Sequence, residues 1–195
     1  MGMSEELILK NINRHIRLNG EETDYFLSLL QTRVIRRKGF LLRANEVCKN
    51  ESFITKGCLR TYTLDDAGLE HTLMFAAEDW WTGDLYSFLT QQPSSLMIDA
   101  TEDTTILQIS RANLEQLYQK VPKFERFFRI MFQNAFIAQQ ERIKQNLSFT
   151  AEQRYCQFLD KWPDLEQRLS QKQVASYLGI TPEFLSMIRR KQARK

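Results

Sequence analysis

The spacing of apolar residues divides the chain into a helical start, a strand-rich middle and a helical end. Helical spacing runs through residues 4–18 and 21–30, and it returns after Ser110 with a short helix over residues 111–119. Between these segments, short alternating or β-rich runs are separated by turn residues. The seven runs cover residues 34–36, 40–42, 52–55, 58–64, 70–76, 97–100 and 104–109. Short strands at this spacing predict an antiparallel sandwich or barrel.

A much longer helix is predicted from Pro122 to about Ser148, about 27 residues or roughly 40 Å at 1.5 Å per residue. Its apolar residues keep a heptad-like spacing, whereas its other side is polar. Packing against the strands would cover part of the apolar stripe, and a second copy of the chain would cover the rest. We favour this second contribution and predict a homodimer through the helix. The predicted contact residues are Phe128, Met131, Phe132, Ala135, Phe136, Ile143 and Leu147.

Residues 171–190 have the pattern of a helix-turn-helix. Ala175 allows a second helix to cross closely, and Gly179 suits the positive φ of a sharp turn. Thr181 is a good N-cap, and Pro182 falls at the first helical position, where its missing N–H costs nothing. The alternative is an ordinary helical hairpin with a solvated basic tail, and the two interpretations predict different partners.

A further helix precedes this motif. Thr150 and Gln153 have the order of a capping box, and Trp162-Pro163 closes the helix that they open. A hinge is therefore expected near residue 149. The predicted class is α+β, with helices before and after an antiparallel strand-rich domain.

Composition and charge describe a folded protein without export or membrane signals. Of the 195 residues, 26% are charged and 43% are hydrophobic. No apolar run approaches the length of about 20 residues that a membrane span needs, and the N-terminus lacks the regions of a signal peptide. A cytoplasmic location is therefore expected. The net charge is +3, and residues 150–195 hold nine Lys/Arg against five Asp/Glu, so double-stranded DNA is the expected partner of that end.

The sequence offers little for metal or covalent chemistry. Cys48, Cys58 and Cys156 are an odd number without C-x-x-C spacing, which predicts buried, reduced thiols. His15 and His71 are far apart in the sequence and are expected in packing or surface roles. A jelly-roll enzyme would need a cluster of histidines on its strands, so we expect no catalytic residue, metal site or firm cofactor.

The order of strand-rich domain, long helix and helix-turn-helix resembles the Crp/Fnr superfamily of bacterial transcription regulators, the cyclic-AMP receptor protein family. Local similarity to a short subfamily common in Bacteroidetes lies in Glu152-Gln-Arg-Tyr155, Trp162-Pro163 and Ala175–Glu183 followed by Leu185-Ser186. The resemblance implies a jelly roll that senses a small molecule or nucleotide, a dimer through the long helix and DNA recognition by the last helix. RNA polymerase is a candidate further partner.

The same resemblance implies three domains. Residues 1–121 would be the effector-sensing jelly roll with its N-terminal helices, residues 122–149 the dimerisation helix and residues 150–195 the DNA-binding domain. Only residues 161–169 separate the helices that flank the second half of this last domain. A β-hairpin wing, which many relatives carry, is therefore not expected.

The expected effector position departs from the family's phosphate-binding cassette. The family's Gly-Glu-Leu is matched by Gly83-Asp84-Leu85, while its later Arg-Ser pair is best matched by Ser94-Ser95. A buried phosphate without a guanidinium is poorly compensated, so cyclic AMP is disfavoured as the effector. Neighbouring aromatic residues would fill the core or suit a flat apolar effector. The expected effector positions are Trp80, Trp81, Gly83, Asp84, Leu85, Tyr86, Ser94 and Ser95.

The predicted reading helix departs from the family at Met187, which stands where an arginine able to reach guanine is common. Base contacts would then fall on Pro182, Glu183 and Ser186, and the basic residues would anchor the phosphate backbone. The predicted DNA-binding residues are Lys172, Thr181, Pro182, Glu183, Ser186, Met187, Arg189, Arg190 and Lys191. These features favour a dimeric, sequence-specific transcription regulator. The alternative is a ligand-sensing or protein-interaction module that has lost specific DNA binding.

Overall fold

The computed structural model describes residues 2–193, and close contacts within the chain group these residues into two units. One unit contains the chain up to Thr61 together with Phe75–Asn134. The other contains Tyr62–Met74 together with the chain from Ala135 onward. Within residues 2–193, no helix has both the length and the apolar composition that crossing a membrane requires.

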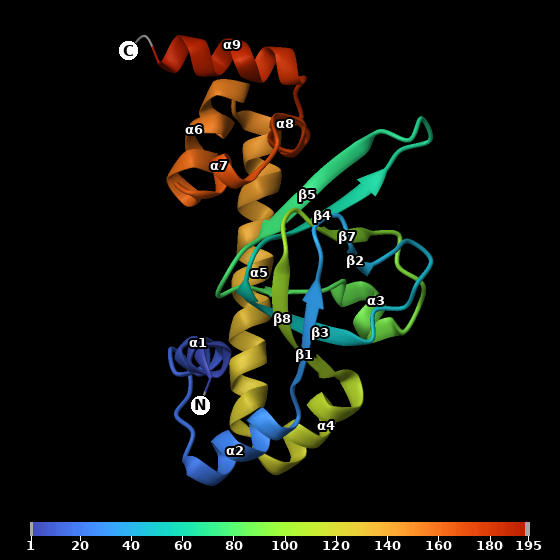
Figure 1. Ribbon diagram of the computed structural model, residues 1–195, viewed down its shortest axis with the longest axis vertical. Helices are drawn as coiled ribbons and strands as arrows, with labels where there is room; N and C mark the ends of the chain where they lie inside the picture. The colour runs from blue at the N-terminus through green and yellow to red at the C-terminus, as the bar shows by residue number, and fades with distance from the viewer. Residues whose placement is uncertain (1, 194–195) are drawn as a thin grey trace. The chain divides into compact units, whose positions relative to one another are not determined.

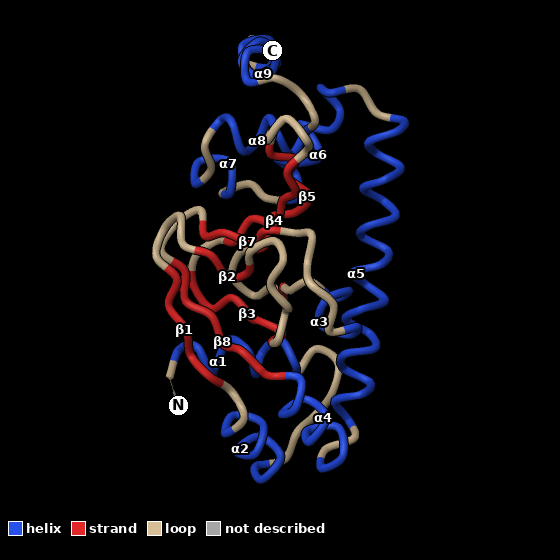
Figure 2. The backbone as a smooth tube through the Cα atoms, turned by 90° about the vertical axis from the view of Figure 1, so that its right-hand side faces the viewer, coloured by secondary structure: helices blue, strands red, loops and turns tan. Residues whose placement is uncertain are grey.

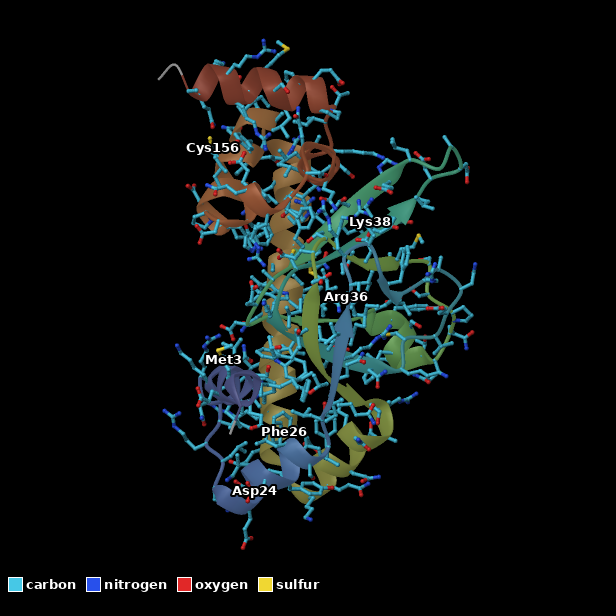
Figure 3. The ribbon with its side chains drawn as sticks, viewed as in Figure 1. Met3, Asp24, Phe26, Arg36, Lys38 and Cys156 are labelled. Atoms are coloured by element: carbon cyan, nitrogen blue, oxygen red, sulfur yellow. The ribbon has the colours of Figure 1, made fainter. Side chains whose placement is uncertain are left out.

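Two helices precede the strands, as the sequence predicts. They are α1, Met3–Ile12, and α2, Gly20–Ser28. The prediction for α1 extended too far, because the chain turns after Ile12, with Asn13 as the C-cap. A capping box starts α2, in which the Glu22 N–H donates to Asn19 Oδ1 at 2.8 Å. Phe26, labelled in Figure 3, points from α2 into the core and has no exposed surface.

The strands of the described chain form two antiparallel four-stranded sheets (Figures 1 and 2). Their orders are β1-β8-β3-β6 and β2-β7-β4-β5. The strands are β1 Gln31–Ile35, β2 Phe40–Leu42, β3 Asn50–Lys56, β4 Leu59–Leu64, β5 Glu70–Ala76, β6 Trp81–Thr82, β7 Met97–Ala100 and β8 Thr104–Ser110. All seven predicted runs are strands. The sequence misses β6, because two residues show no periodicity.

The core of the first unit joins the sheets to the first turns of the long helix α5, Lys123–Ser148. Phe124, Phe127 and Phe128 are at most 1% exposed. Phe124 stacks on Phe26 with 4.8 Å between ring centroids, and Phe128 meets Trp81 edge-on at 5.4 Å. These contacts explain why the start of α5 is richer in phenylalanine than a helix on the surface would be. The remaining helices of this unit are α3, Leu85–Thr90, and α4, Arg111–Lys120.

The second unit contains the later turns of α5, the outer part of the β4–β5 hairpin and a group of short helices (Figure 1). The helices are α6 Ala151–Lys161, α7 Leu165–Arg168, α8 Gln171–Leu178 and α9 Pro182–Gln192. The predicted capping box starts α6, where the Gln153 N–H donates to Thr150 Oγ1 at 3.3 Å, and Trp162 ends it before Pro163. The α+β class is confirmed. Helix α7 is not predicted, because four residues are too few for a helical period.

The cysteines and histidines take separate positions. Cys48 and Cys58 are buried as expected, whereas Cys156, labelled in Figure 3, is exposed on α6. His15 lies 6.0 Å from the Phe127 ring, and His71 Nε2 lies 2.8 Å from a carboxylate oxygen of Asp65. In residues 2–193, no group of three or more His, Cys, Asp or Glu side chains is placed to hold a metal ion.

Candidate nucleic-acid interface and effector position

The turn between α8 and α9 has the geometry that the sequence predicts for a helix-turn-helix. Gly179 adopts φ +65°, in the left-handed region that favours glycine, and its N–H donates to the carbonyls of Ala175 and Ser176. Thr181 Oγ1 then accepts from the Phe184 N–H at 3.2 Å, and Pro182 occupies the first turn of α9. The predicted glycine, N-cap and proline roles are all confirmed.

Small and branched side chains hold the two helices together. Ala175 and Leu178 on α8 are at most 2% exposed, and so are Leu185 and Ile188 on α9. Because these residues bury one side of α9, the other side is left for contact with another molecule. The two helices of the predicted helix-turn-helix are therefore packed against each other, and one face of α9 is left exposed.

The outer face of α9 presents acidic, apolar and basic side chains. Glu183, Met187 and Arg190 are exposed, and Met187 has 58% of its surface accessible. Phe184 is also 44% exposed beside them, although the sequence did not single it out. Helical spacing could have predicted this exposure, because Phe184 lies outside the face that Leu185 and Ile188 bury. An apolar surface of this kind can contact the methyl group of thymine.

Ser186 is a half-buried link between α8 and α9 rather than an outward reading residue. The Gln171 side-chain amide on α8 donates to Ser186 Oγ, and it also donates to the Pro182 carbonyl at 2.6 Å. Ser186 Oγ itself donates to that carbonyl at 3.1 Å. The expected base contact from Ser186 is thus corrected to a role in packing the motif.

Arg189 is anchored inside the second unit. Its guanidinium donates to Glu166 Oε1 at 2.9 Å, and the Tyr155 hydroxyl donates to the same carboxylate. Lys191 Nζ pairs with Glu152 Oε1 at 2.7 Å. Arg189 was expected to anchor DNA, but its described contacts fix α9 to α6 and α7. The sequence could not show this, because the three partners are more than ten residues apart along the chain.

Two of the predicted phosphate contacts remain exposed and without an acidic partner. Among residues 2–193, neither Lys172 nor Arg190 forms an ion pair with a carboxylate. Lys172 lies in the first turn of α8, and Arg190 lies in the last turns of α9. Exposed cations of this kind are available to a phosphate backbone.

The outer part of the β4–β5 hairpin is bonded to α8. Ser176 Oγ donates to the Glu70 carbonyl at 2.6 Å and accepts from the Thr72 N–H at 2.9 Å. The Ser176 hydroxyl thus links α8 to two backbone groups of β5 and fixes the position of the hairpin against the helix. The described part of residues 150–193 is helical, as expected for a domain without its own wing, yet a β-hairpin from earlier in the chain adjoins it.

At the expected effector position, Asp84 is satisfied by protein groups. Asp84 Oδ1 accepts from the Ser87 N–H at 3.3 Å as the N-cap of α3, and Oδ2 accepts from Ser94 Oγ at 2.6 Å. Asp84 is 6% exposed and Ser94 is 2% exposed. Ser94 replaces the arginine of the cassette and neutralises no charge. The carboxylate thus occupies the end of α3 at which a phosphate would otherwise be favoured.

A second carboxyl group lies beside the first. Glu51 on β3 is 3% exposed, and a Cβ built on Gly83 would meet its Oε2 at 3.2 Å. Burial, with a smaller contribution from repulsion by Asp84, raises the pKa of Glu51 from 4.5 to about 7. The sequence missed Glu51, because an acid at the start of a strand looks like an ordinary edge residue. The one indication in the sequence was that Glu51 directly precedes the predicted strand over residues 52–55.

The aromatic residues of this region do not form one pocket. Trp81 is 8% exposed, packs on Phe53 and Phe128, and donates to Asn11 Oδ1 at 3.2 Å. It is a core residue, so its assignment to an effector pocket is corrected. The other expected positions are Trp80, Leu85, Tyr86 and Ser95, and these are exposed. Asp84 and Ser94 are buried and in contact with each other, and Gly83 is half-buried beside them.

A cyclic phosphate does not fit the groups gathered there. Asp84 and Glu51 would bring one or two negative charges against it, and no guanidinium replaces the missing arginine at Ser94. The buried Arg60 on β4 is held by both oxygens of Asp99, with Nε to Oδ1 at 3.0 Å and a second N–H to Oδ2 at 2.7 Å. Gly83, Asp84 and Ser94 thus offer a phosphate no positive charge.

The long helix carries an apolar stripe beyond the part that packs in the core. Phe136, Ile143 and Leu147 are 63%, 57% and 81% exposed and lie on one face of α5. Met131 and Phe132 are partly buried against the core of the first unit. Ala135 is exposed on the same helix. Phe128 is buried against Trp81, so its assignment to a dimer contact is corrected.

Fold and site together define a helix-turn-helix protein with an antiparallel, strand-rich domain. Residues 32–121 match the family described as the cyclic nucleotide-binding domain. The chain is 25% identical over 188 residues to the fumarate and nitrate reduction regulatory protein of Vibrio cholerae, with 88% of this chain and 72% of that protein covered. The anaerobic regulatory protein of Haemophilus influenzae is 23% identical over 188 residues, with 88% and 70% covered.

A solved structure shows the same fold. The c-di-GMP responsive global regulator CLP of Xanthomonas campestris matches with a TM-score of 0.72 at 14% identity, covering 90% of this chain and 92% of that chain. This likeness confirms the predicted jelly-roll fold. The family match over residues 32–121 and the two regulatory relatives agree with the resemblance to Crp/Fnr regulators.

Proposed function

We propose that this regulator binds double-stranded DNA through α9 and acts as a homodimer. The observation that carries the proposal is the outer face of the helix-turn-helix, where Glu183, Met187 and Arg190 are exposed on a packed α9. Glu183 would accept from a cytosine amino group, and Met187 would make apolar contacts with base edges. Arg190 and Lys172 would contact phosphates and supply most of the affinity.

The proposed dimer contact is the exposed stripe of Phe136, Ile143 and Leu147 on α5. Exposed apolar side chains at this spacing on a long helix are covered in stable proteins, and an identical helix offers a matching stripe. Two copies would present two reading helices, which suits operators whose half-sites lie about 34 Å apart. A palindromic recognition sequence is therefore expected.

The proposed sensory input of the jelly roll is not cyclic AMP. Asp84, Ser94 and Glu51 fill the cassette region with groups that attract a proton or a hydrogen-bond donor rather than a phosphate. A regulatory signal would act by shifting the equilibrium between arrangements of the DNA-reading helices. The cytoplasm is the proposed location of this DNA binding.

The test begins with selection of sequences from a random duplex library by the full chain. Affinity for the selected duplex is then measured by fluorescence anisotropy at several salt concentrations. The double change Lys172→Ala with Arg190→Ala should weaken binding at least about tenfold. It should also reduce the slope of log K against log salt concentration by about 2, because two phosphate contacts are lost. A matched control, Lys10→Ala with Arg37→Ala, removes the same charge from exposed residues of the first unit and should have little effect.

Two outcomes would oppose the proposal. Selection of no sequence by a folded, dimeric protein would favour the alternative, a sensing or interaction module without specific DNA binding. Equal weakening by both double variants would show that net charge, rather than the face of α9, governs the interaction.

A further inference from the structure

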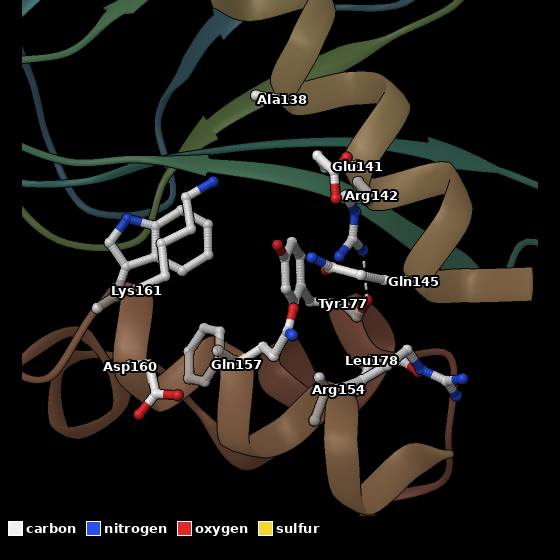
Figure 4. A pocket seen from close by; sticks show the side chains of 12 residues that line it. Ala138, Glu141, Arg142, Gln145, Arg154, Gln157, Asp160, Lys161, Tyr177 and Leu178 are labelled. Carbon is white, nitrogen blue, oxygen red and sulfur yellow. Dashed lines mark hydrogen bonds between the residues drawn. The ribbon is translucent and has the colours of Figure 1, made fainter. Parts of the chain in front are cut away.

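A cavity of about 500 Å³ lies within the second unit, between the later turns of α5, the helix α6 and the end of α8 (Figure 4). This volume is within the range of sites that hold small molecules. Its lining combines three cationic side chains with three aromatic ones, which is an unusual composition for a simple packing defect. The cations are Arg142, Arg154 and Lys161, and the aromatic residues are Phe158, Trp162 and Tyr177.

Both guanidinium groups are held in place by backbone carbonyls. Arg142 donates to the Tyr177 carbonyl, drawn as a dashed line in Figure 4, and its Cζ lies 3.5 Å from the centroid of the Tyr177 ring. Arg154 donates to the Leu178 carbonyl at 3.2 Å and to the Phe149 carbonyl at 2.6 Å. Tyr177 and Leu178 form the C-terminal end of α8, where positive charge is favourable. The two cations are therefore positioned rather than free to move away.

Neither guanidinium is neutralised by the protein. Among residues 2–193, Arg142 and Arg154 form no ion pair with a carboxylate. Glu141 also lines the cavity but is paired with Lys144, and Asp160 is exposed at its edge. A guanidinium has five N–H donors, and Arg142 uses part of this set on the carbonyl and side chain of Tyr177. The site thus has donors and positive charge in excess.

The surroundings of Arg142 disfavour its positive charge on balance. Burial lowers the pKa of Arg142, Tyr177 offsets part of this effect, and the neighbouring charge of Arg154 lowers the pKa further. Lys161 brings a third positive charge, and burial followed by repulsion from Arg142 lowers its pKa as well. An anion bound between these groups would relieve the repulsion and form charge-assisted hydrogen bonds.

The aromatic residues form a wall beside the cations. Ring centroids of Trp162 and Tyr177 are 5.7 Å apart, and each lies 5.6 Å from that of Phe158. Such a wall offers ring faces and edges to a flat molecule. Because Arg142 belongs to α5 and Tyr177 to α8, a molecule in the cavity would touch both the long helix and the first helix of the helix-turn-helix.

We propose that this cavity binds a small planar aromatic anion, a ring that carries one carboxylate or phosphate group. The anionic group lies between Arg142 and Arg154, and the ring lies against Trp162 and Tyr177. Phe136 and Ile143 project from a different side of α5, so the proposed dimer contact does not compete for this cavity. The site does not depend on DNA binding, so the two proposals fail separately.

Isothermal titration of the full chain with salicylate and with 5′-AMP tests the proposal, since these probes carry a carboxylate and a phosphate. At least one should bind with one molecule per chain and a submillimolar Kd. The uncharged counterparts, salicylamide and adenosine, should bind at least about tenfold more weakly, because they lack the charge-assisted hydrogen bonds. Binding of only one probe identifies the anionic group that the site prefers.

Variants locate the site. Arg142→Gln and Arg154→Gln should each weaken the bound probe about tenfold or more through loss of one charged donor. The control Arg129→Gln removes an exposed arginine from α5 outside the cavity and should bind as the parent does. Circular dichroism confirms folding, and Arg154→Gln carries the test if Arg142→Gln unfolds. Failure of both probes to bind the folded parent at millimolar concentration, or equal binding by both cavity variants, would overturn the proposal.

Discussion

Ser94 Oγ donates to Asp84 Oδ2 at 2.6 Å, and this buried hydrogen bond joins the residues that replace the acid and the arginine of the family's phosphate cassette. A carboxylate and a hydroxyl satisfy each other without any ligand. A carboxylate and an arginine in the same positions would instead form a site for sugar and phosphate. This pair therefore leaves no positive charge at this position to offset a bound phosphate.

Cyclic AMP and cyclic GMP should not bind to the chain. The buried carboxyl groups of Glu51 and Asp84 would repel a phosphate placed beside them. The guanidinium that would offset the charge of the phosphate is missing. Isothermal titration at millimolar nucleotide should show no saturable heat from the jelly roll. The measurement is best made with Arg142→Gln, so that the separate cavity of the second unit does not contribute. Saturable binding to that variant would contradict the assignment.

The stability of the chain should depend on pH through Glu51. Its folded pKa of about 7 exceeds the ordinary value of 4.5, so its stabilising contribution is complete below pH 4.5 and is lost as the pH rises through 7. The change Glu51→Gln should therefore raise the free energy of unfolding at pH 8 relative to the parent, by up to about 3 kcal/mol at about 1.4 kcal/mol per pKa unit. At pH 4.5 the gain should vanish.

Denaturant titrations at the two pH values measure this difference. Glu115→Gln, which changes an exposed acid on α4, serves as the control and should show no such pH dependence. An equal effect of Glu51→Gln at both pH values would show that the carboxyl does not titrate in this range.

Arg189 and Arg190 should separate stability from DNA affinity. Arg189→Met removes the partner of Glu166 and should lower the free energy of unfolding by about 1 to 2 kcal/mol, since a half-buried carboxylate loses a charged hydrogen bond. Arg190→Met should change stability by less than about 0.5 kcal/mol and should weaken DNA binding instead. Chemical denaturation and anisotropy on the same proteins compare the two effects. The reverse pattern would mean that Arg189 faces the DNA.

Dimerisation should fail when charge enters the stripe on α5. Phe136→Glu and Ile143→Glu each place a carboxylate in the exposed apolar face and should yield monomers in sedimentation equilibrium at micromolar concentration. Asn134→Glu adds the same charge on the opposite side of the helix and should remain dimeric. A monomeric parent protein would refute the dimer outright.

Met187 should set the sequence preference of α9. Met187→Arg supplies a bidentate donor at an exposed position and should favour a guanine there, with about 1 to 3 kcal/mol of discrimination. Met187→Leu keeps an apolar side chain and should leave the preference unchanged. Selection from random duplexes with the three proteins reveals the preferred base at each position. Identical selected sequences would place Met187 away from the base edges.

Local patterns determined most of the fold. The strands from β1 to β8 follow from alternation and turn residues, with β6 as the exception, and Gly179, Thr181 and Pro182 determine the helix-turn-helix because their effects act within one turn. The basic charge at the end of the chain and the absence of an arginine at position 94 also follow from the sequence alone.

Only the tertiary structure decided which of these residues remain available to a partner. Arg189 meets Glu166, Ser186 meets Gln171 and Trp81 enters the core, and each contact joins segments whose approach no local pattern encodes. The cavity beside Arg142 likewise depends on three helices meeting. Burial and ion pairing are properties of the packed chain. They decide whether a charged side chain is paired within the protein or is available to bind another molecule.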